Sequence, residues 1–172
     1  MATPLDRTAE LMTDADITEV SMSVKKILVP TDGSATAVEA TKVAVSMAKV
    51  FGAEIVALYV NFGSVETPIE YLDTEAMEGI KHSAAGLDVA VKLGEKNGVV
   101  VSCVTSEGAV GNRIVAVSRE AEVDLIIMGS VGRTGFKRLA LGSVAESVMK
   151  EAEAPVLVVR SCTTEFCMTP RG

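Results

Sequence analysis

Aromatic side chains are scarce in this chain. Its 172 residues include no tryptophan, two tyrosines and four phenylalanines. Proteins that bind single-stranded nucleic acid stack the bases on aromatic rings, so this scarcity removes that kind of platform. A planar ligand would instead have to rest on aliphatic side chains and be fixed by backbone hydrogen bonds.

Cysteine and histidine are also rare. Three cysteines are an odd number and do not make the framework of a disulfide-stapled protein. Cys103 falls within the apolar run 99–104, which predicts a buried, unreactive thiol. Cys162 and Cys167 are interpreted as tail thiols, because a metal site there would need further ligands. The single histidine, His82, is predicted to be a surface or structural residue.

Long apolar runs and an excess of basic residues are both missing. No stretch approaches the roughly 20 consecutive apolar residues of a membrane span, although the mean hydropathy is +0.36. Sixteen Lys and Arg face 23 Asp and Glu, a net charge of −7, which argues against nucleic acid polymers as partners. The N-terminus has no cationic region followed by an apolar one, so it does not resemble a secretory signal. We expect a cytoplasmic protein without a membrane partner.

The length fits one domain with a tail at each end. Residues 1–24 hold five carboxylates against one arginine, a net charge of −4, and their apolar residues are only weakly periodic. They are interpreted as a flexible extension or as a short helix that docks on a partner or on the domain. The domain is predicted to span 25–160, and 161–172 form a C-terminal tail.

Short aliphatic runs recur along the middle of the chain. None alternates strictly with polar residues, which is typical of parallel strands covered on both faces. Between the first two runs, alanines with Met47 and Phe51 repeat at helical spacing, and Gly52 is a suitable helix end. A loop over 61–67 and a helix over about 68–97, either continuous or broken, are predicted after the second run. The runs are 27–29, 55–60, 99–104, 125–128 and 156–159.

Strands and helices therefore alternate throughout the domain. This alternation predicts an α/β fold with one open, doubly wound, Rossmann-like parallel sheet of five strands and helices on both faces. In such sheets, ligands bind beyond the carboxyl ends of the strands, where the strand order reverses. The segments that follow the strands are therefore the places to look for a site.

Two of these segments carry suitable chemistry. The first strand is followed by residues 30–34, with the sequence PTDGS, and the fourth by a glycine-rich loop over 129–143. No acidic residue lies between Asp124 and Glu146, whereas Arg133, Lys137 and Arg138 do. Glycines that admit a ligand to the backbone, local positive charge and a following helix N-terminus are typical of a phosphate site.

Familiar phosphate and nucleophile motifs are absent. The chain has no G-x4-G-K-[ST] loop, no G-x-G-x-x-G fingerprint and no G-x-S-x-G elbow. The loop instead reads Gly129-x2-Gly132-x9-Gly142-Ser143, which matches the G-x2-G-x9-G-[ST] nucleotide-binding signature of universal stress proteins. The opening KKILVPTDGS and the stretch DLIIMGSVGRTGFKRLALGSVAESVMKEAEAPVLVVR also resemble that family. The resemblance covers about 25–160 and implies strand order 3-2-1-4-5 and, in the ATP-binding branch, a bound adenine nucleotide.

The resemblance also implies roles for individual residues. Pro30, Thr31 and Asp32 would contact adenine and ribose, and Asp32 would help to hold Mg²⁺ or Mn²⁺ with the phosphates. The end of the second strand, at Val60, would meet the adenine edge through its backbone. The remaining residues of the implied site border the ribose and cradle the phosphates: Met128, Gly129, Gly132, Gly142, Ser143 and Val144. Ala145 departs from the pattern, because binding members often have Ser or Thr there.

Each of these residues also has a simpler interpretation. Asp32 would only shape a turn or cap the first helix, and Thr31 would be a polar strand end. Val60 and Met128 would be apolar wall with or without a ligand. Arg133 is either a phosphate partner or a solvated loop residue, whereas Lys137 and Arg138 are interpreted as solvated. Ser143 either caps its helix or binds a phosphate oxygen.

Three functions are therefore open. The first is an ATP- or AMP-binding stress or signalling module whose ligand changes its conformation or its choice of downstream protein. The second is a slow ATP hydrolase, with Asp32 and Arg133 supplying some of the chemistry, and the third is a scaffold that binds no nucleotide. The apolar last strand, 155–160, predicts a homodimer, because an uncovered apolar edge favours pairing with a second copy.

Overall fold

A computed structural model of the protein describes residues 23–61, 74–132 and 141–160, and for 74–83 it describes the backbone only. Strand β1 (Lys26–Pro30) leads to helix α2 (Ala35–Phe51), followed by β2 (Glu54–Asn61) and α3 (Thr74–Asn97). The second half holds β3 (Val101–Glu107), α4 (Val110–Glu120), β4 (Leu125–Gly129), α5 (Ser143–Glu151) and β5 (Val156–Val159). None of the helices described is long and apolar enough to cross a membrane.

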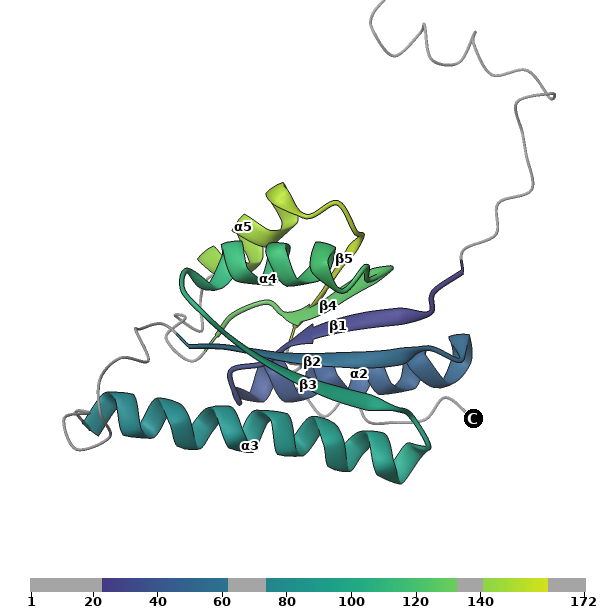
Figure 1. Ribbon diagram of the computed structural model, residues 1–172, viewed down its shortest axis with the longest axis horizontal. Helices are drawn as coiled ribbons and strands as arrows, with labels where there is room; N and C mark the ends of the chain where they lie inside the picture. The colour runs from purple at the N-terminus through teal and green to yellow at the C-terminus, as the bar shows by residue number, and fades with distance from the viewer. Residues whose placement is uncertain (1–22, 62–73, 133–140, 161–172) are drawn as a thin grey trace, which may run out of the picture.

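The five strands form one parallel sheet in the order β3-β2-β1-β4-β5, which confirms the predicted fold class and strand order. Helices α2 and α3 cover one face, and α4 and α5 cover the other (Figure 1). Central β1 pairs with both β2 and β4, with Ile27 opposite Ile55 on one side and Leu125 on the other. The chain therefore winds outward from β1 to β3 and returns to β4, so the strand order reverses between β1 and β4.

The two sides of the sheet have separate apolar cores. In β1, Ile27 and Val29 face the α2 side with Ala40 and Ala44, whereas Leu28 faces the α4 side. Successive side chains of a strand point to opposite faces, so a strand covered on both must be apolar throughout. This is why the runs 27–29, 55–60 and 125–128 lack alternation.

The predicted boundaries hold where local chemistry fixes them. Helix α2 ends at Phe51, and Gly52 caps it with a left-handed φ of 67°, as its position predicted. Val24 is buried in the core beside the first strand, although the sequence places it in the extension. Residues 1–22 of the extension, the loop residues 62–67, the predicted helical segment 68–73 and the tail with Cys162 and Cys167 lie outside the described residues.

The prediction for Cys103 was wrong. The run 99–104 suggested a fully covered strand, but β3 begins at Val101 and lies at the edge of the sheet. Ser102, Cys103 and Thr105 are exposed, because the edge has no further strand and is incompletely covered by helices. Partial burial still raises the pKa of the Cys103 thiol, which keeps it protonated near neutral pH.

Candidate functional site

The loops that follow β1 and β4 lie side by side at the carboxyl edge of the sheet. Their strands are direct neighbours, so both loops leave the sheet at the point where its strand order reverses. Two observations show how closely the β4 loop approaches the β1 loop and the start of α2. The Thr36 hydroxyl donates a hydrogen bond to the Val131 carbonyl, and a Cβ placed on Gly132 would lie 2.8 Å from Asp32 Oδ2.

The β1 loop is held by its own polar side chains. Thr31 is 6% exposed, its N–H donates to the Leu58 carbonyl at 2.8 Å, and its hydroxyl accepts from the Gly33 N–H. Asp32 Oδ1 accepts from the Ser34 N–H at 3.0 Å, so the carboxylate shapes the turn. Ser34, not Asp32, caps α2, because its hydroxyl accepts from the Ala37 N–H at 3.2 Å. The other carboxylate oxygen of Asp32 faces Gly132.

The glycines of the β4 loop have different neighbours. A Cβ on Gly129 would lie 3.0 Å from the Thr36 carbonyl carbon and hydroxyl, so this glycine lets β4 approach α2. At Gly132 the nearest atom belongs to a side chain, the Asp32 carboxylate, and the residue is exposed. Gly129 therefore serves packing first, whereas Gly132 keeps space open between the two loops.

The loop returns to its own beginning before α5. The Gly142 N–H donates to the Ser130 carbonyl at 2.7 Å, and Gly142 is the N-cap residue of the helix. No side chain makes a capping hydrogen bond, so Ser143 does not cap α5 and its side chain is exposed. The first N–H groups of a helix have no intrahelical partner. The N–H groups of Ser143 and Val144 therefore have no partner within their own helix.

The aliphatic residues of the predicted site line the sheet on the α4–α5 side. Val60 and Met128 are 9% and 4% exposed and belong to that core, and Pro30 ends β1 as a buried residue. Ala145 is 2% exposed and packs in the same core, where a Ser or Thr hydroxyl would need a partner. Arg133, Lys137 and Arg138 lie outside the described residues.

Sequence reasoning missed two residues that build this region. Thr36 connects the start of α2 to the β4 loop, but in the sequence it is only a threonine inside an alanine-rich helix. A Cβ on Gly86 would lie 2.8 Å from the Thr31 hydroxyl and 3.0 Å from the Gly33 nitrogen, so α3 closely approaches the β1 loop there. Gly86 lies inside the helix predicted over about 68–97, and a glycine in a helical pattern is a signal of close packing.

Chemically, the site offers backbone N–H groups, one carboxylate and aliphatic walls. Within the described ranges, no cluster of three or more His, Cys, Asp or Glu residues could hold a metal ion. The only acidic residue in the first turn of α5 is Glu146, and its hydrogen bond with Lys150 lowers its pKa. The arrangement suits an uncharged ring on the walls and an anion at the loop and helix start.

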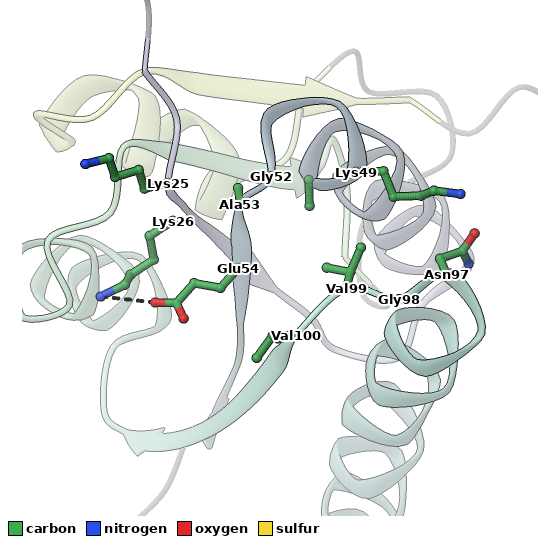
Figure 2. Close-up of a pocket in the computed structure, with 11 residues that line it drawn as sticks. Lys25, Lys26, Lys49, Gly52, Ala53, Glu54, Asn97, Gly98, Val99 and Val100 are labelled. Atoms are coloured by element: carbon green, nitrogen blue, oxygen red, sulfur yellow. Dashed lines mark ion pairs between the residues drawn. The ribbon is translucent and has the colours of Figure 1, made fainter.

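A pocket of about 760 Å³ lies at the opposite edge of the sheet, at the amino ends of β1, β2 and β3 (Figure 2). Ala48, Ala53 and Val99 are among its lining residues, and Lys26 forms an ion pair with Glu54 at 3.4 Å. It contains none of the predicted site residues. Its position, away from the point where strand order reverses, separates it from the candidate site.

Known proteins resemble this chain in both sequence and structure. The sequence model of the universal stress protein family matches residues 23–160. The chain is 41% identical over 146 residues to the universal stress protein MJ0531 of Methanocaldococcus jannaschii, covering 79% of this chain and 82% of that one. The solved structure of MJ0577 superposes with a TM-score of 0.68 at 32% identity, covering 83% of this chain and 100% of that chain.

Two further structural neighbours were solved with nucleotides. A universal stress protein in complex with cAMP has a TM-score of 0.66 at 23% identity, covering 82% of this chain and all of that chain. The universal stress protein of Archaeoglobus fulgidus in complex with dAMP has a TM-score of 0.61 at 23% identity, covering 80% and 99%. At this identity, these two show the shared fold. The family model and the 41% identical relative establish that this chain belongs to the universal stress protein family.

Proposed function

We propose that this protein binds an adenine nucleotide, ATP or AMP, between the β1 and β4 loops and acts as a cytoplasmic stress or signalling module. One observation carries the proposal. Asp32, Gly132 and the start of α5 lie together at the carboxyl ends of β1 and β4, where the strand order reverses. Related proteins solved with cAMP and dAMP support the class of ligand.

The residues present fit such a ligand. Gly132 leaves space beside the Asp32 carboxylate that a side chain would fill. The N–H groups of Ser143 and Val144 would hold phosphate oxygens at the helix start, with Gly142 admitting them to the backbone. Val60 and Met128 would wall the adenine, and Thr31 would keep the first loop in place. Asp32 would hold a divalent ion only together with the phosphates, because the described residues include no group of three or more His, Cys, Asp or Glu that could hold the ion alone.

Slow ATP hydrolysis is the second candidate. The Asp32 carboxylate next to the phosphate loop favours it, since a divalent ion there would neutralise charge on the γ-phosphate. Asp32→Asn keeps an oxygen for the Ser34 N–H but removes the charge, whereas Asp32→Ala removes both. If Asp32 acts by its charge, both variants lose turnover and only Asp32→Ala also loosens the turn.

The test begins with the purified wild-type protein. Its bound ligand is extracted and identified, then the melting temperature is followed with ATP, and turnover is measured. A ligand at 100 times its dissociation constant stabilises a protein by about 2.7 kcal/mol, or roughly 5–10 °C for a domain of this size. If saturating ATP leaves the melting temperature unchanged and no nucleotide is extracted, both nucleotide functions fail and the scaffold remains.

Two glycine variants locate the phosphates. Gly132→Val and Gly142→Val should block ATP while the far-ultraviolet circular dichroism spectrum stays that of the wild type. A Cβ on Gly142 would meet the Ser130 carbonyl at 3.2 Å, so some loss of stability is expected there. Normal ATP affinity in both variants would contradict this placement of the phosphates.

We also propose a homodimer through the last strand segment, residues 155–160, which contains β5. This edge strand is apolar, and Leu157 is 37% exposed. The carbonyls of Pro155 and Val159 accept hydrogen bonds from the β4 side. By strand alternation, the backbone groups of Val156 and Val158 point to the free edge.

Val158→Pro therefore removes an edge N–H without removing a hydrogen bond to β4. Its mass by analytical ultracentrifugation should be that of a monomer, while the wild type is a dimer at micromolar concentration. A monomeric wild type would refute the dimer.

A further inference from the structure

A chain of hydrogen bonds runs from the start of α2 to the β4 loop. The Ala37 N–H donates to Ser34 Oγ at 3.2 Å, Ser34 Oγ and Thr36 Oγ1 are 3.1 Å apart, and Thr36 Oγ1 bonds the Val131 carbonyl. Thr36 is 6% exposed, so water has little access to its hydroxyl.

The direction of each proton in this chain follows from the acceptors. The Val131 carbonyl can only accept, so the single Thr36 hydroxyl proton points to it. Thr36 Oγ1 must then accept from Ser34, whose Oγ in turn accepts from the Ala37 N–H. All donors point one way, from the helix backbone toward the loop, and hydrogen bonds aligned in this way polarise and strengthen one another.

The end of the chain fixes the orientation of one peptide group. The Val131–Gly132 peptide is trans, since none of the described peptides is cis, so its C=O and N–H point in opposite directions. With the carbonyl held by Thr36 at the start of α2, the Gly132 N–H must point away from α2. No acceptor among the described residues bonds this N–H.

We propose that Thr36 is a positioning residue for nucleotide binding: by holding the Val131 carbonyl, it aims the Gly132 N–H at a phosphate oxygen of the ligand. The inference rests on the proposed nucleotide-binding function. Thr36 does not touch the ligand in this scheme. It removes the rotational freedom of the peptide before the ligand arrives, so that freedom need not be lost on binding.

Substitutions at two buried threonines of α2 test this. Thr36→Val removes the hydroxyl at nearly constant size, and Thr36→Ser restores it. Thr41→Val is the matched control, because Thr41 is 1% exposed and its hydroxyl bonds only the Ala37 carbonyl of its own helix, at 2.8 Å. All four proteins are compared by calorimetric titration with ATP, by thermal unfolding, and by the residual dipolar coupling of the Gly132 N–H without ligand.

The expected result separates positioning from stability. Thr36→Val should weaken ATP binding about fivefold, the effect of one ordinary hydrogen bond, and should change the Gly132 coupling. Thr36→Ser should keep both within about twofold of the wild type. Thr41→Val should lower the melting temperature without changing the affinity or the coupling.

Two results would overturn the inference in distinguishable ways. If the wild type binds ATP and Thr36→Val has the same affinity and the same Gly132 coupling, only the role of Thr36 is refuted. A wild type that does not bind ATP would overturn the proposed function, and the positioning role with it.

Discussion

Gly129→Ala would insert a methyl group where β4 passes closest to α2. The new Cβ would lie 3.0 Å from the Thr36 carbonyl carbon and hydroxyl and 3.1 Å from the Thr36 Cβ. Ordinary contacts begin near 3.4 Å, and two of the three neighbouring atoms belong to the backbone or to the branch point of a buried residue. Neither can move alone, so the strand end and the helix start must separate.

The size of the effect follows from two opposing terms. Overpacking of a well-packed region costs about 1–3 kcal/mol, and replacing glycine in a strand returns up to about 1 kcal/mol of chain entropy. We expect a net loss of about 1–2 kcal/mol in the free energy of unfolding. For a domain of this size, this corresponds to roughly 2–8 °C in melting temperature.

Gly132→Ala is the matched control in the same loop. Its Cβ would meet Asp32 Oδ2 at 2.8 Å, but the next atom is 3.9 Å away and a carboxylate can rotate. Urea unfolding of both variants should show a lower midpoint with unchanged slope for Gly129→Ala and a midpoint close to the wild type for Gly132→Ala. The packing role of Gly129 is refuted if its variant is as stable as the wild type, or if Gly132→Ala is the more damaging change.

Three further predictions concern other parts of the domain. Ser34→Ala should lower stability by about 1 kcal/mol in urea unfolding, because α2 loses its capping hydroxyl; an unchanged midpoint would contradict this. Hydrogen bonds from the Lys25 and Lys26 N–H groups lower the pKa of Asp124. The ionised Asp124 carboxylate therefore stabilises the fold fully above its unfolded pKa of about 3.9, and this stabilisation is lost as pH falls through the folded pKa. Asp124→Asn should therefore be less stable than the wild type at pH 7, with a gap that narrows in acid, and a pH-independent gap would refute the assignment. Cys103 is exposed but has a raised pKa, so its reaction with a thiol reagent should be slow at pH 7 and accelerate above its ordinary pKa; fast labelling at pH 7 would contradict this.

Patterns within short segments predicted the fold well. The strands at 27–29, 55–60 and 125–128 are buried on both faces. The apolar composition of each segment is therefore enough to predict a covered strand. Gly52 ends α2 through its own left-handed backbone conformation, a local property that the sequence predicts. Strand order has no such local signal, and it was predicted only through the resemblance of the glycine signature to a known family.

The errors and omissions have a common physical origin. Cys103 has apolar neighbours in the run 99–104, yet its exposure depends on β3 being an edge strand, and that position is set by the strand order of the whole sheet. Thr36 and Gly86 act through contacts with residues far along the chain, Val131 and Thr31, so their roles appear only once the helices are placed. Asp32 was predicted to have either a turn or a ligand role. One of its oxygens accepts from the Ser34 N–H in the turn, the other faces Gly132, and the ligand role stays a prediction.

The two open margins of the sheet differ in character, and this bears on how far self-association can go. The β5 margin is aliphatic, whereas the β3 margin presents the exposed polar side chains of Ser102, Thr105 and Glu107. If two copies join through β5, both outer margins of the enlarged sheet are β3. A charged and polar margin is a poor template for adding another chain. Such an assembly is self-terminating at two copies, and the same apolar strand that invites association does not lead to fibres.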